Sequence, residues 1–599
     1  MSRGPHLRRR IGAAALAGAL ALAAGSALAA TTGSLTPAGC IGAPGTSPAS
    51  CNTPANLNSV NSVTVSPDGH TVYTTAFKSE AVDVFTRAAN GALTPAGCLG
   101  NNGSGPGNCT GVDGLSNPIS LAVSPDGQNA YVAASFSNDL VLLTRRSDGA
   151  LISMGCIGDI HFGPPSCTAQ ANLNGADGVA VSPDGNTVYV VSASSNAIEV
   201  MARAANGSLT PSGCIGNNGT GPGNCTGADG LVTPVYVVVS PDGKNVYVVS
   251  VGSDALVIFA RRGDGALTSM GCVGDLTMGP ASCTTHANLQ GPRSVAVSPD
   301  GKNVYVASEG SKAIEVFNRA ADGSLTPAGC LGNNGNGPGN CTGVDGIDGV
   351  DSVAVSPDGQ NVYATASASN TVVVLTRNTS GALFSAGCIG NTGTGPASCN
   401  GTDGLSGADG VAVSPDGGNV YATASLSNTL LTFNRTVPAG GGGGSGGGGG
   451  SGGTGGSGPG SAGGGPSFTH VLRTSHSRFR VGGSGHTGHK HIPAGTTFSF
   501  ALSENASVTI TFLQAHSGRR VSGSCVKPSS SNARRSRCTR FLAVGVVKAT
   551  GHKGANHVVF SGKINGLALP PGSYRASAVA TDSSKKTSQA STANFTVVS

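Results

Sequence analysis

The chain has 599 residues, of which 11% are charged, 96 are glycine and none is tryptophan, and this length allows several domains. The formal net charge of +6 divides unevenly: residues 31–438 hold 14 basic and 27 acidic side chains, whereas residues 467–599 hold 17 basic and 2 acidic. An acidic body is therefore joined to a basic tail. Beyond the N-terminal region no stretch is long and apolar enough to cross a bilayer, which excludes a protein built from membrane-spanning helices.

Residues 1–30 predict a signal peptide. Arg3, Arg8, Arg9 and Arg10 precede an apolar run over 11–24, and small residues at 26–30 offer a cleavage site. A membrane anchor is the alternative, but the run is too short to span a bilayer. We therefore expect a secreted, extracellular protein, free or associated with the cell envelope, with no transmembrane span.

Residues 31–437 consist of seven repeats with a step of 58 residues. A Cys-x10-Cys pair begins each step, first at Cys40 and next at Cys98. Ser-Pro-Asp-Gly keeps the same step from Ser66, as do a tyrosine from Tyr73 and an arginine from Arg87. Seven copies without insertion or deletion indicate a repeat architecture.

Each repeat reads as four short strands. In the sixth repeat, segments at 351–356, 361–366, 371–377 and 382–385 are separated by turn residues, including Pro-Asp-Gly after the first strand. In other repeats the third turn carries Asn-Gly or Asp-Gly, a strong hairpin signal. Four antiparallel strands with a long link to the next unit describe a propeller blade. The sequence therefore predicts an all-β, seven-bladed β-propeller.

The two ends of the repeat region predict how the ring closes. Residues 31–40 have the sequence of a fourth strand with no blade before it, and the last repeat, 411–435, has three strands and no fourth. The N-terminal strand should therefore complete the last blade, which removes the free edge of an open ring.

The cysteines predict disulfides in an oxidising compartment. A metal site would need further ligands that recur in every loop, and none does. A redox centre is usually Cys-x-x-Cys. We expect no metal and no cofactor. The expected pairs are Cys40–Cys51, Cys98–Cys109, Cys156–Cys167, Cys214–Cys225, Cys272–Cys283, Cys330–Cys341, Cys388–Cys399 and, in the tail, Cys525–Cys538.

The repeated Arg and Tyr are interpreted as structural, since seven identical copies do not make the single asymmetric constellation that catalysis needs. Each Arg and each Pro-Asp-Gly turn belong to the same end of a blade. We expect Arg87 to pair with Asp68 of its own blade, and likewise in the other six.

Function should appear where the repeats differ, on the face that holds the inter-blade loops and the mouth of the central channel. The weak catalytic candidates are His161, His286, Arg293 and Glu309. A general base needs an orienting partner, and the sequence places no carboxylate beside either histidine. Solvated loop histidines are the alternative interpretation. No phosphate loop, nucleophile elbow or zinc-protease motif is present.

The segments 294–308 (SVAVSPDGKNVYVAS) and 313–326 (AIEVFNRAADGSLT) resemble the repeat of the lactonase-type seven-bladed propellers. That family includes phosphogluconolactonases, carboxymuconate cyclases and YVTN-repeat surface proteins. The resemblance covers about residues 32–437 and implies the fold and a lactonase-like hydrolase activity. It transfers no catalytic residue, because the matching positions are the turns and strands of every blade.

Residues 438–466 are nearly all glycine and serine and predict a flexible linker. Residues 467–599 show short alternating strands and resemble a bacterial immunoglobulin-like β-sandwich. A basic group there is a candidate site for an anionic cell-wall polymer, with a solvated basic face as the alternative. Nucleic acid is not expected, since aromatics do not interleave with the basic residues. The group comprises Arg519, Arg520, Lys527, Arg534, Arg535, Arg537 and Arg540.

Two functional hypotheses follow. In the first, the propeller is a binding or interaction scaffold for an unknown small molecule or protein, tethered to a basic module. In the second, it is a secreted lactonase-like hydrolase acting on a small lactone. The uniform blades favour the first, and the family resemblance favours the second.

Overall fold

The computed structural model describes residues 33–52, 55–437, 468–475, 478–481, 495–521, 524–526, 535–564, 567–582, 588 and 591–598. The predicted signal peptide and Gly/Ser linker lie outside these residues. The chain divides into two compact units, Met1–Gly447 and Gly448–Ser599. Among the described residues no helix is long and apolar enough to span a membrane.

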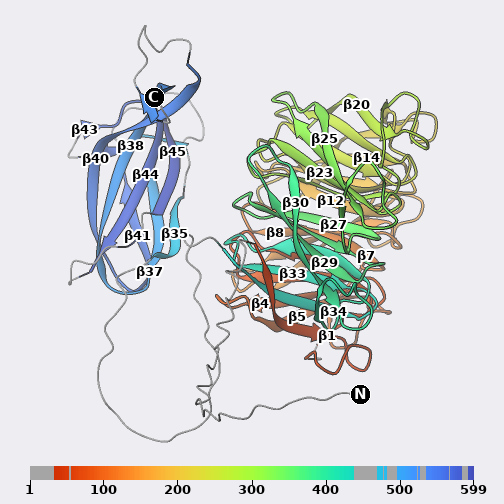
Figure 1. The fold of residues 1–599 in the computed structure, drawn as a ribbon. Helices are drawn as coiled ribbons and strands as arrows, with labels where there is room; N and C mark the ends of the chain where they lie inside the picture. The colour runs from red at the N-terminus through yellow and green to blue at the C-terminus, as the bar shows by residue number, and fades with distance from the viewer. Residues whose placement is uncertain are drawn as a thin grey trace, which may run out of the picture. The chain divides into compact units, whose positions relative to one another are not determined.

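The first unit is a closed ring of seven sheets, in each of which four strands are antiparallel (Figure 1). The N-terminal strand β1 (Leu35–Gly42) pairs with β34 (Thr429–Arg435), the third strand of the last blade, from Leu35 opposite Arg435 to Gly42 opposite Thr429. Figure 1 shows these two ends of the propeller chain side by side. The predicted fold class and ring closure are confirmed.

The strands of the first four blades have the following bounds: β2 (Val60–Val65), β3 (Thr71–Ala76), β4 (Ala81–Arg87), β5 (Leu93–Asn101) and β6 (Thr110–Val112); β7 (Pro118–Val123), β8 (Asn129–Ala134), β9 (Asp139–Arg145), β10 (Leu151–Asp159) and β11 (Thr168–Gln170); β12 (Ala176–Val181), β13 (Thr187–Ser192), β14 (Ala197–Arg203), β15 (Leu209–Asn217) and β16 (Thr226–Ala228); β17 (Pro234–Val239), β18 (Asn245–Ser250), β19 (Ala255–Arg261), β20 (Leu267–Asp275) and β21 (Thr284–His286).

The remaining blades comprise β22 (Pro292–Val297), β23 (Asn303–Ser308), β24 (Ala313–Arg319), β25 (Leu325–Asn333) and β26 (Thr342–Val344); β27 (Val350–Val355), β28 (Asn361–Ala366), β29 (Thr371–Arg377), β30 (Leu383–Asn391) and β31 (Asn400–Thr402); and, in the blade that β1 completes, β32 (Ala408–Val413), β33 (Asn419–Ala424) and β34.

The fourth strand is longer than predicted, and a fifth strand was missed. The sequence interpretation ends the fourth strand of the sixth blade at 385, but β30 continues to Asn391. The three residues after the second cysteine then pair in parallel with the residues after the first, as Ile389 does with Asn400. The disulfide loop therefore reverses the chain and adds a short outer strand, although its own residues form turns.

The structure joins each Cys-x10-Cys pair of the propeller by a disulfide. Each closes a twelve-residue loop, worth about 3 kcal/mol in the chain-entropy description. Cys538 is also disulfide-bonded. The side chain of its predicted partner, Cys525, lies outside the described residues.

The hydrophobic core lies between neighbouring blades. The second strand of every blade is buried along its whole length. Side chains such as Tyr73 and Val82 of one blade pack with Leu121 and Val132 of the next. Such contacts stabilise each blade only when its neighbour is in place.

The predicted Arg–Asp pairing within one blade is wrong, because each arginine reaches the preceding blade. Arg145 donates from Nη2 to Asp68 at 2.8 Å and from Nε to the Tyr73 hydroxyl at 2.7 Å. Tyr73 in turn donates to the carbonyl of Gly149 in the blade that holds Arg145. We call this set of contacts the inter-blade clamp. The same Arg–Asp pair recurs at all seven junctions.

The loop between the second and third strands ends in every blade on a residue with positive φ. In five blades this residue is Asn or Asp, and its side-chain oxygen accepts a hydrogen bond from the start of the next blade, as Asn196 does from the Thr233 N–H at 2.8 Å. Lys312 occupies the position in the fifth blade with φ +53°.

We expect Lys312→Asn to stabilise the propeller by about 0.5–1 kcal/mol, because asparagine tolerates the left-handed region and lysine does not. The ion pair of Lys312 with Asp348 is partly exposed and contributes little. The urea midpoint of unfolding should rise, and the reverse variant Asn196→Lys should lower it. A midpoint that falls for Lys312→Asn would contradict this account.

The described residues of the second unit form two larger sheets, one of order β35-β37-β41 and one of order β36-β45-β44-β38-β39 with β40 also paired to β38, and a two-stranded sheet of β42 and β43. Phe498, Phe512, Phe560 and Phe595 pack between the two larger sheets, as in a β-sandwich. The immunoglobulin-like class remains a prediction. The strands are β35 (Phe468–Thr474), β36 (Arg478–Arg480), β37 (Thr496–Leu502), β38 (Ala506–Val521), β39 (Ser524–Val526), β40 (Arg537–Gly551), β41 (Gly554–Phe560), β42 (Lys563–Ile564), β43 (Leu567–Ala568), β44 (Gly572–Thr581) and β45 (Ser591–Val598).

Candidate active site in the central channel

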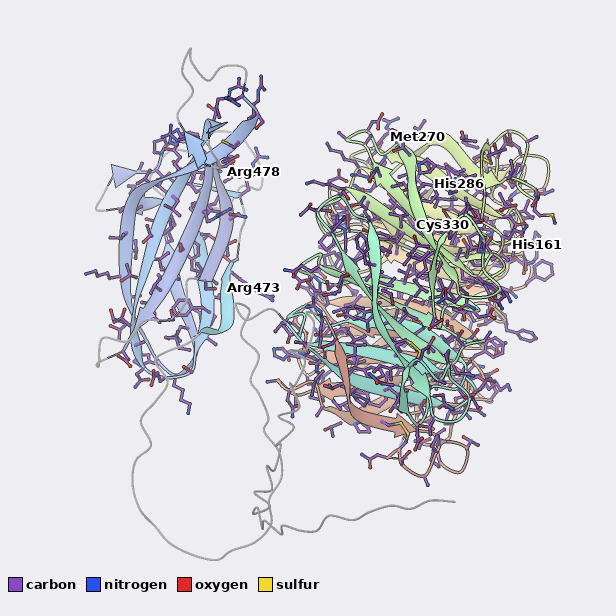
Figure 2. The ribbon with its side chains drawn as sticks, viewed as in Figure 1. His161, Met270, His286, Cys330, Arg473 and Arg478 are labelled. Atoms are coloured by element: carbon purple, nitrogen blue, oxygen red, sulfur yellow. A yellow bond between two sulfur atoms is a disulfide. The ribbon has the colours of Figure 1, made fainter. Side chains whose placement is uncertain are left out.

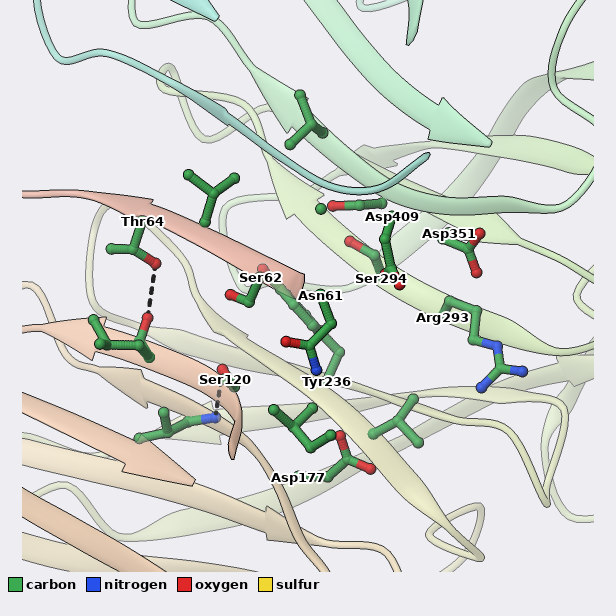
Figure 3. Close-up of a pocket in the computed structure, with 18 residues that line it drawn as sticks. Asn61, Ser62, Thr64, Ser120, Asp177, Tyr236, Arg293, Ser294, Asp351 and Asp409 are labelled. Atoms are coloured by element: carbon green, nitrogen blue, oxygen red, sulfur yellow. Dashed lines mark hydrogen bonds between the residues drawn. The ribbon is translucent and has the colours of Figure 1, made fainter. Parts of the chain in front are cut away.

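The first strand of each blade lines a central cavity of about 480 Å³. These seven strands are equivalent, but the second residue of each differs in charge and polarity. The residues at this one register position are Asn61, Ile119, Asp177, Val235, Arg293, Asp351 and Asp409. A ring of near-identical blades therefore encloses an asymmetric polar cluster, which we call the channel cluster (Figure 3).

The next position adds hydroxyl groups to the wall. Ser62, Ser120, Ser294 and Ser352 come from four of the strands, and Tyr236 stands at the same position on β17. Tyr236 is 37% exposed, which is high for a tyrosine within a closed ring. The cavity thus offers carboxylates, hydroxyls and one aromatic ring to a bound molecule (Figure 3).

Arg293 and Glu309, two of the four sequence candidates, are brought together. Arg293 Nε donates to Glu309 Oε2 at 2.6 Å. Arg293 lies on β22, and Glu309 follows β23 of the same blade at the end where the inter-blade loops lie. Their side chains are 44% and 36% exposed, and of the two only Arg293 belongs to the lining of the cavity.

The aspartates of the channel cluster have raised pKa values. Burial, reinforced by repulsion from Asp351, raises the pKa of Asp409 to about 8. Burial likewise raises the pKa of Asp351 to about 6, where a hydrogen bond from Ser367 opposes the shift. Burial raises the pKa of Asp177 to about 7, against the charge of Arg293. The cluster therefore exchanges protons near neutral pH, as acid–base catalysis requires.

This protonation should make the channel a source of pH-dependent stability. Asp409 binds its proton more tightly in the folded chain than in the unfolded chain, so folding loses stability as pH rises from about 4 to about 8. We expect Asp409→Asn to leave the melting temperature unchanged near pH 4 and to stabilise by about 1–2 kcal/mol at pH 8.5, after allowance for the residue's partial exposure. Calorimetry at the two pH values measures the difference. Equal effects at both would contradict the assignment.

Neither candidate histidine belongs to the lining of the channel, and Figure 2 labels both of them. His161 is exposed on the disulfide loop that follows β10. His286, at the end of the outer strand β21, contacts Glu315 of the next blade, with 2.7 Å between Nε2 and Oε2. Two blades earlier, Gln170 makes the equivalent contact to Glu199. This equivalence indicates a structural role for His286 between blades.

Sequence reasoning missed Asp177, Asp351 and Asp409. Loops and singular residues are the conspicuous departures from the repeat, whereas these three aspartates lie within regular strands. The second position of the inner strand varies more in charge than its neighbours, and that signal was available in the seven aligned repeats.

In the tail, part of the basic group gathers at one end of the β38–β40 hairpin. Arg519 lies opposite Arg537 in the strand pairing, and its Nη1 donates to the carbonyl of Arg535 at 2.9 Å. Arg540 follows three residues after Arg537 on β40. Arg520 belongs to β38, and Lys527 and Arg534 lie outside the described residues.

Comparison with known proteins places the repeats in a class. Residues 194–396 match the family model of the lactonase seven-bladed β-propeller. This match over part of the repeat region confirms the resemblance drawn from the repeats. No curated protein matches the chain in sequence.

Similar solved structures include the periplasmic gluconolactonase PpgL of Pseudomonas aeruginosa, with 20% identity, a TM-score of 0.39 and coverage of 54% of this chain and 83% of that one. A protein from Lactobacillus plantarum has 19% identity, a TM-score of 0.41 and coverage of 54% and 83%. Hydrazine synthase of Kuenenia stuttgartiensis has 18% identity, a TM-score of 0.43 and coverage of 65% and 99%.

Proposed function

We propose that the propeller hydrolyses a small lactone in its central channel. The observation that carries this proposal is the channel cluster, one asymmetric set of acidic and basic groups inside an otherwise uniform ring. The match to the lactonase propeller model supports it. The uniform blades favour a scaffold from sequence, but the channel cluster is a feature in which the blades differ from one another.

The proposed step is the addition of water to the lactone carbonyl, followed by cleavage of the ring C–O bond. Asp351, with the lower pKa of the two neighbouring acids, accepts a proton from the attacking water. Arg293 stabilises the negative charge that develops on the carbonyl oxygen. Asp409, protonated at neutral pH, donates a proton to the departing alkoxide. The product is an open-chain hydroxy acid, and water is the only co-reactant.

The test is hydrolysis of a panel of sugar, aryl and acyl-homoserine lactones by the full chain, followed by pH-stat. We expect saturable turnover well above the uncatalysed rate on at least one member. The control is the same protein after thermal unfolding. No turnover on any lactone would overturn the proposal.

Binding without turnover is the second candidate, and the near-identical blades favour it. Under either function we propose export to an oxidising compartment, supported by the seven propeller disulfides. The basic residues at the end of the β38–β40 hairpin support attachment to an anionic polymer of the cell envelope.

A further inference from the structure

The charge on the channel wall restricts which lactones can enter. In the lining contributed by the described inner strands, Arg293 is the single basic side chain, against Asp177, Asp351 and Asp409. The Glu309 Oε2 lies 2.6 Å from Arg293 Nε and accepts a hydrogen bond from it. Glu309 therefore compensates the charge of Arg293 before any ligand arrives. At neutral pH Asp351, with a pKa of about 6, adds a further carboxylate charge, whereas Asp409 is protonated.

A phosphate or carboxylate on the substrate would meet this carboxylate charge. Recognition of such groups needs an uncompensated arginine or lysine, or several backbone N–H groups directed at one point. The wall instead offers carboxylates, hydroxyls and an amide, which accept or share hydrogen bonds from hydroxyl groups. Tyr236 adds an exposed aromatic face beside them, on the strand next to the one that carries Asp177.

We propose that the channel is selective for uncharged, hydroxyl-rich lactones, of the kind formed from neutral sugar acids, and rejects their phosphorylated counterparts. Asp177 and Glu309 are the specificity-determining residues. Glu309 pairs with Arg293, and Asp177 adds a carboxylate to the same wall, two blades away from Arg293 (Figure 3). This inference rests on the proposed hydrolysis and specifies its substrate class.

The experiment compares gluconolactone with its 6-phosphate on the full chain. Like charges facing each other in an enclosed site cost several kcal/mol, so kcat/KM for the phosphorylated lactone should be about 100-fold lower. In Glu309→Gln and Asp177→Asn the ratio of phosphorylated to neutral kcat/KM should rise about tenfold each. Glu80→Gln is the control and should leave the ratio unchanged, because Glu80 lies on the same kind of loop in another blade but contacts Asn101 and Ser116, which do not line the channel.

Binding separates this inference from the proposed hydrolysis. The two corresponding lactams, in which N–H replaces the ring oxygen, are measured by calorimetry. Tighter binding of the neutral lactam, with the same response to the two variants, supports the selectivity even if no lactone is turned over. The selectivity would be overturned if the phosphorylated lactam bound as tightly as the neutral one or more tightly, or if neither lactam bound. It would also be overturned if a third lactam that bears an amine bound most tightly of all.

Discussion

Replacing Asp68 with asparagine should destabilise the propeller by about 2–3 kcal/mol, although Asp68 itself is 40% exposed in its side chain. The reason is its partner, since the Arg145 side chain is only 4% exposed and would keep a buried charge without a counter-ion. The estimate is below the usual 3–5 kcal/mol for a broken buried pair because Arg145 keeps its bonds to Tyr73 and to the Gly127 carbonyl.

The neighbouring residue supplies a matched control. Arg146 pairs with Asp148 at 3.2 Å, but both side chains are more than half exposed. Asp148→Asn should therefore cost less than about 0.5 kcal/mol. Urea unfolding of the two variants measures the contrast. Equal losses would show that the inter-blade clamp does not hold the blades together.

The clamp also predicts how the ring responds to acid. Partial burial alone would raise the pKa of Asp68, but hydrogen bonds from Ser66 and the His70 N–H, with the charge of Arg145, outweigh it and lower the pKa. The equivalent aspartates in the other six blades have lowered pKa values as well. Their contribution to stability is complete above pH 4 and is lost as pH falls below it. Seven equivalent groups should make that loss steep.

The second large effect concerns the channel. Asp351→Asn and Asp409→Asn should each lower kcat by about 10²- to 10⁴-fold on whichever lactone the wild-type chain hydrolyses, since each removes one proton-transfer group. The pH dependence distinguishes the two. Activity of the wild type should rise with an apparent pKa of about 6 and fall with one of about 8, the values of Asp351 and Asp409.

The two acids repel each other, so these apparent pKa values belong to the pair. The pH profile of the residual activity should lose its acidic limb, the rise near pH 6, in Asp351→Asn. It should lose its basic limb, the fall near pH 8, in Asp409→Asn. Asp113→Asn, on an inter-blade loop where Asp113 accepts a hydrogen bond from Asn102, is the control and should keep both limbs. A wild-type profile retained by both channel variants would remove these residues from the mechanism.

The fold was predictable because the seven repeats can be aligned with one another within the single chain. A constant step, turn residues at fixed offsets and an unmatched strand at each end determine blade number and closure. The partner of each arginine was not predictable, because Arg145 lies at the same end of a blade as both Asp126 and Asp68, and only the lateral packing of blades decides which it reaches.

The channel cluster was missed for a related reason. Asp177, Arg293 and Asp409 follow one another at intervals of 116 residues and come to line one cavity only because the blades pack around a common axis. The contact between His286 and Glu315 also crosses a blade junction, so no local pattern reveals it. Periodicity predicts which residues occupy equivalent positions in the blades. It does not predict which side chains meet inside the ring, because that depends on how the blades pack against one another.

The pairing of β1 with β34 has a consequence for the order of events during synthesis. Leu35 is made about 400 residues before its partner Arg435, which at ribosomal speeds is a delay of about 20–80 s. Six blades can assemble their own strands in succession during this time, but the first strand of the chain must wait unpaired. Formation of the seventh sheet is thus the last assembly step, and any ligand that needs the complete channel can bind only after it.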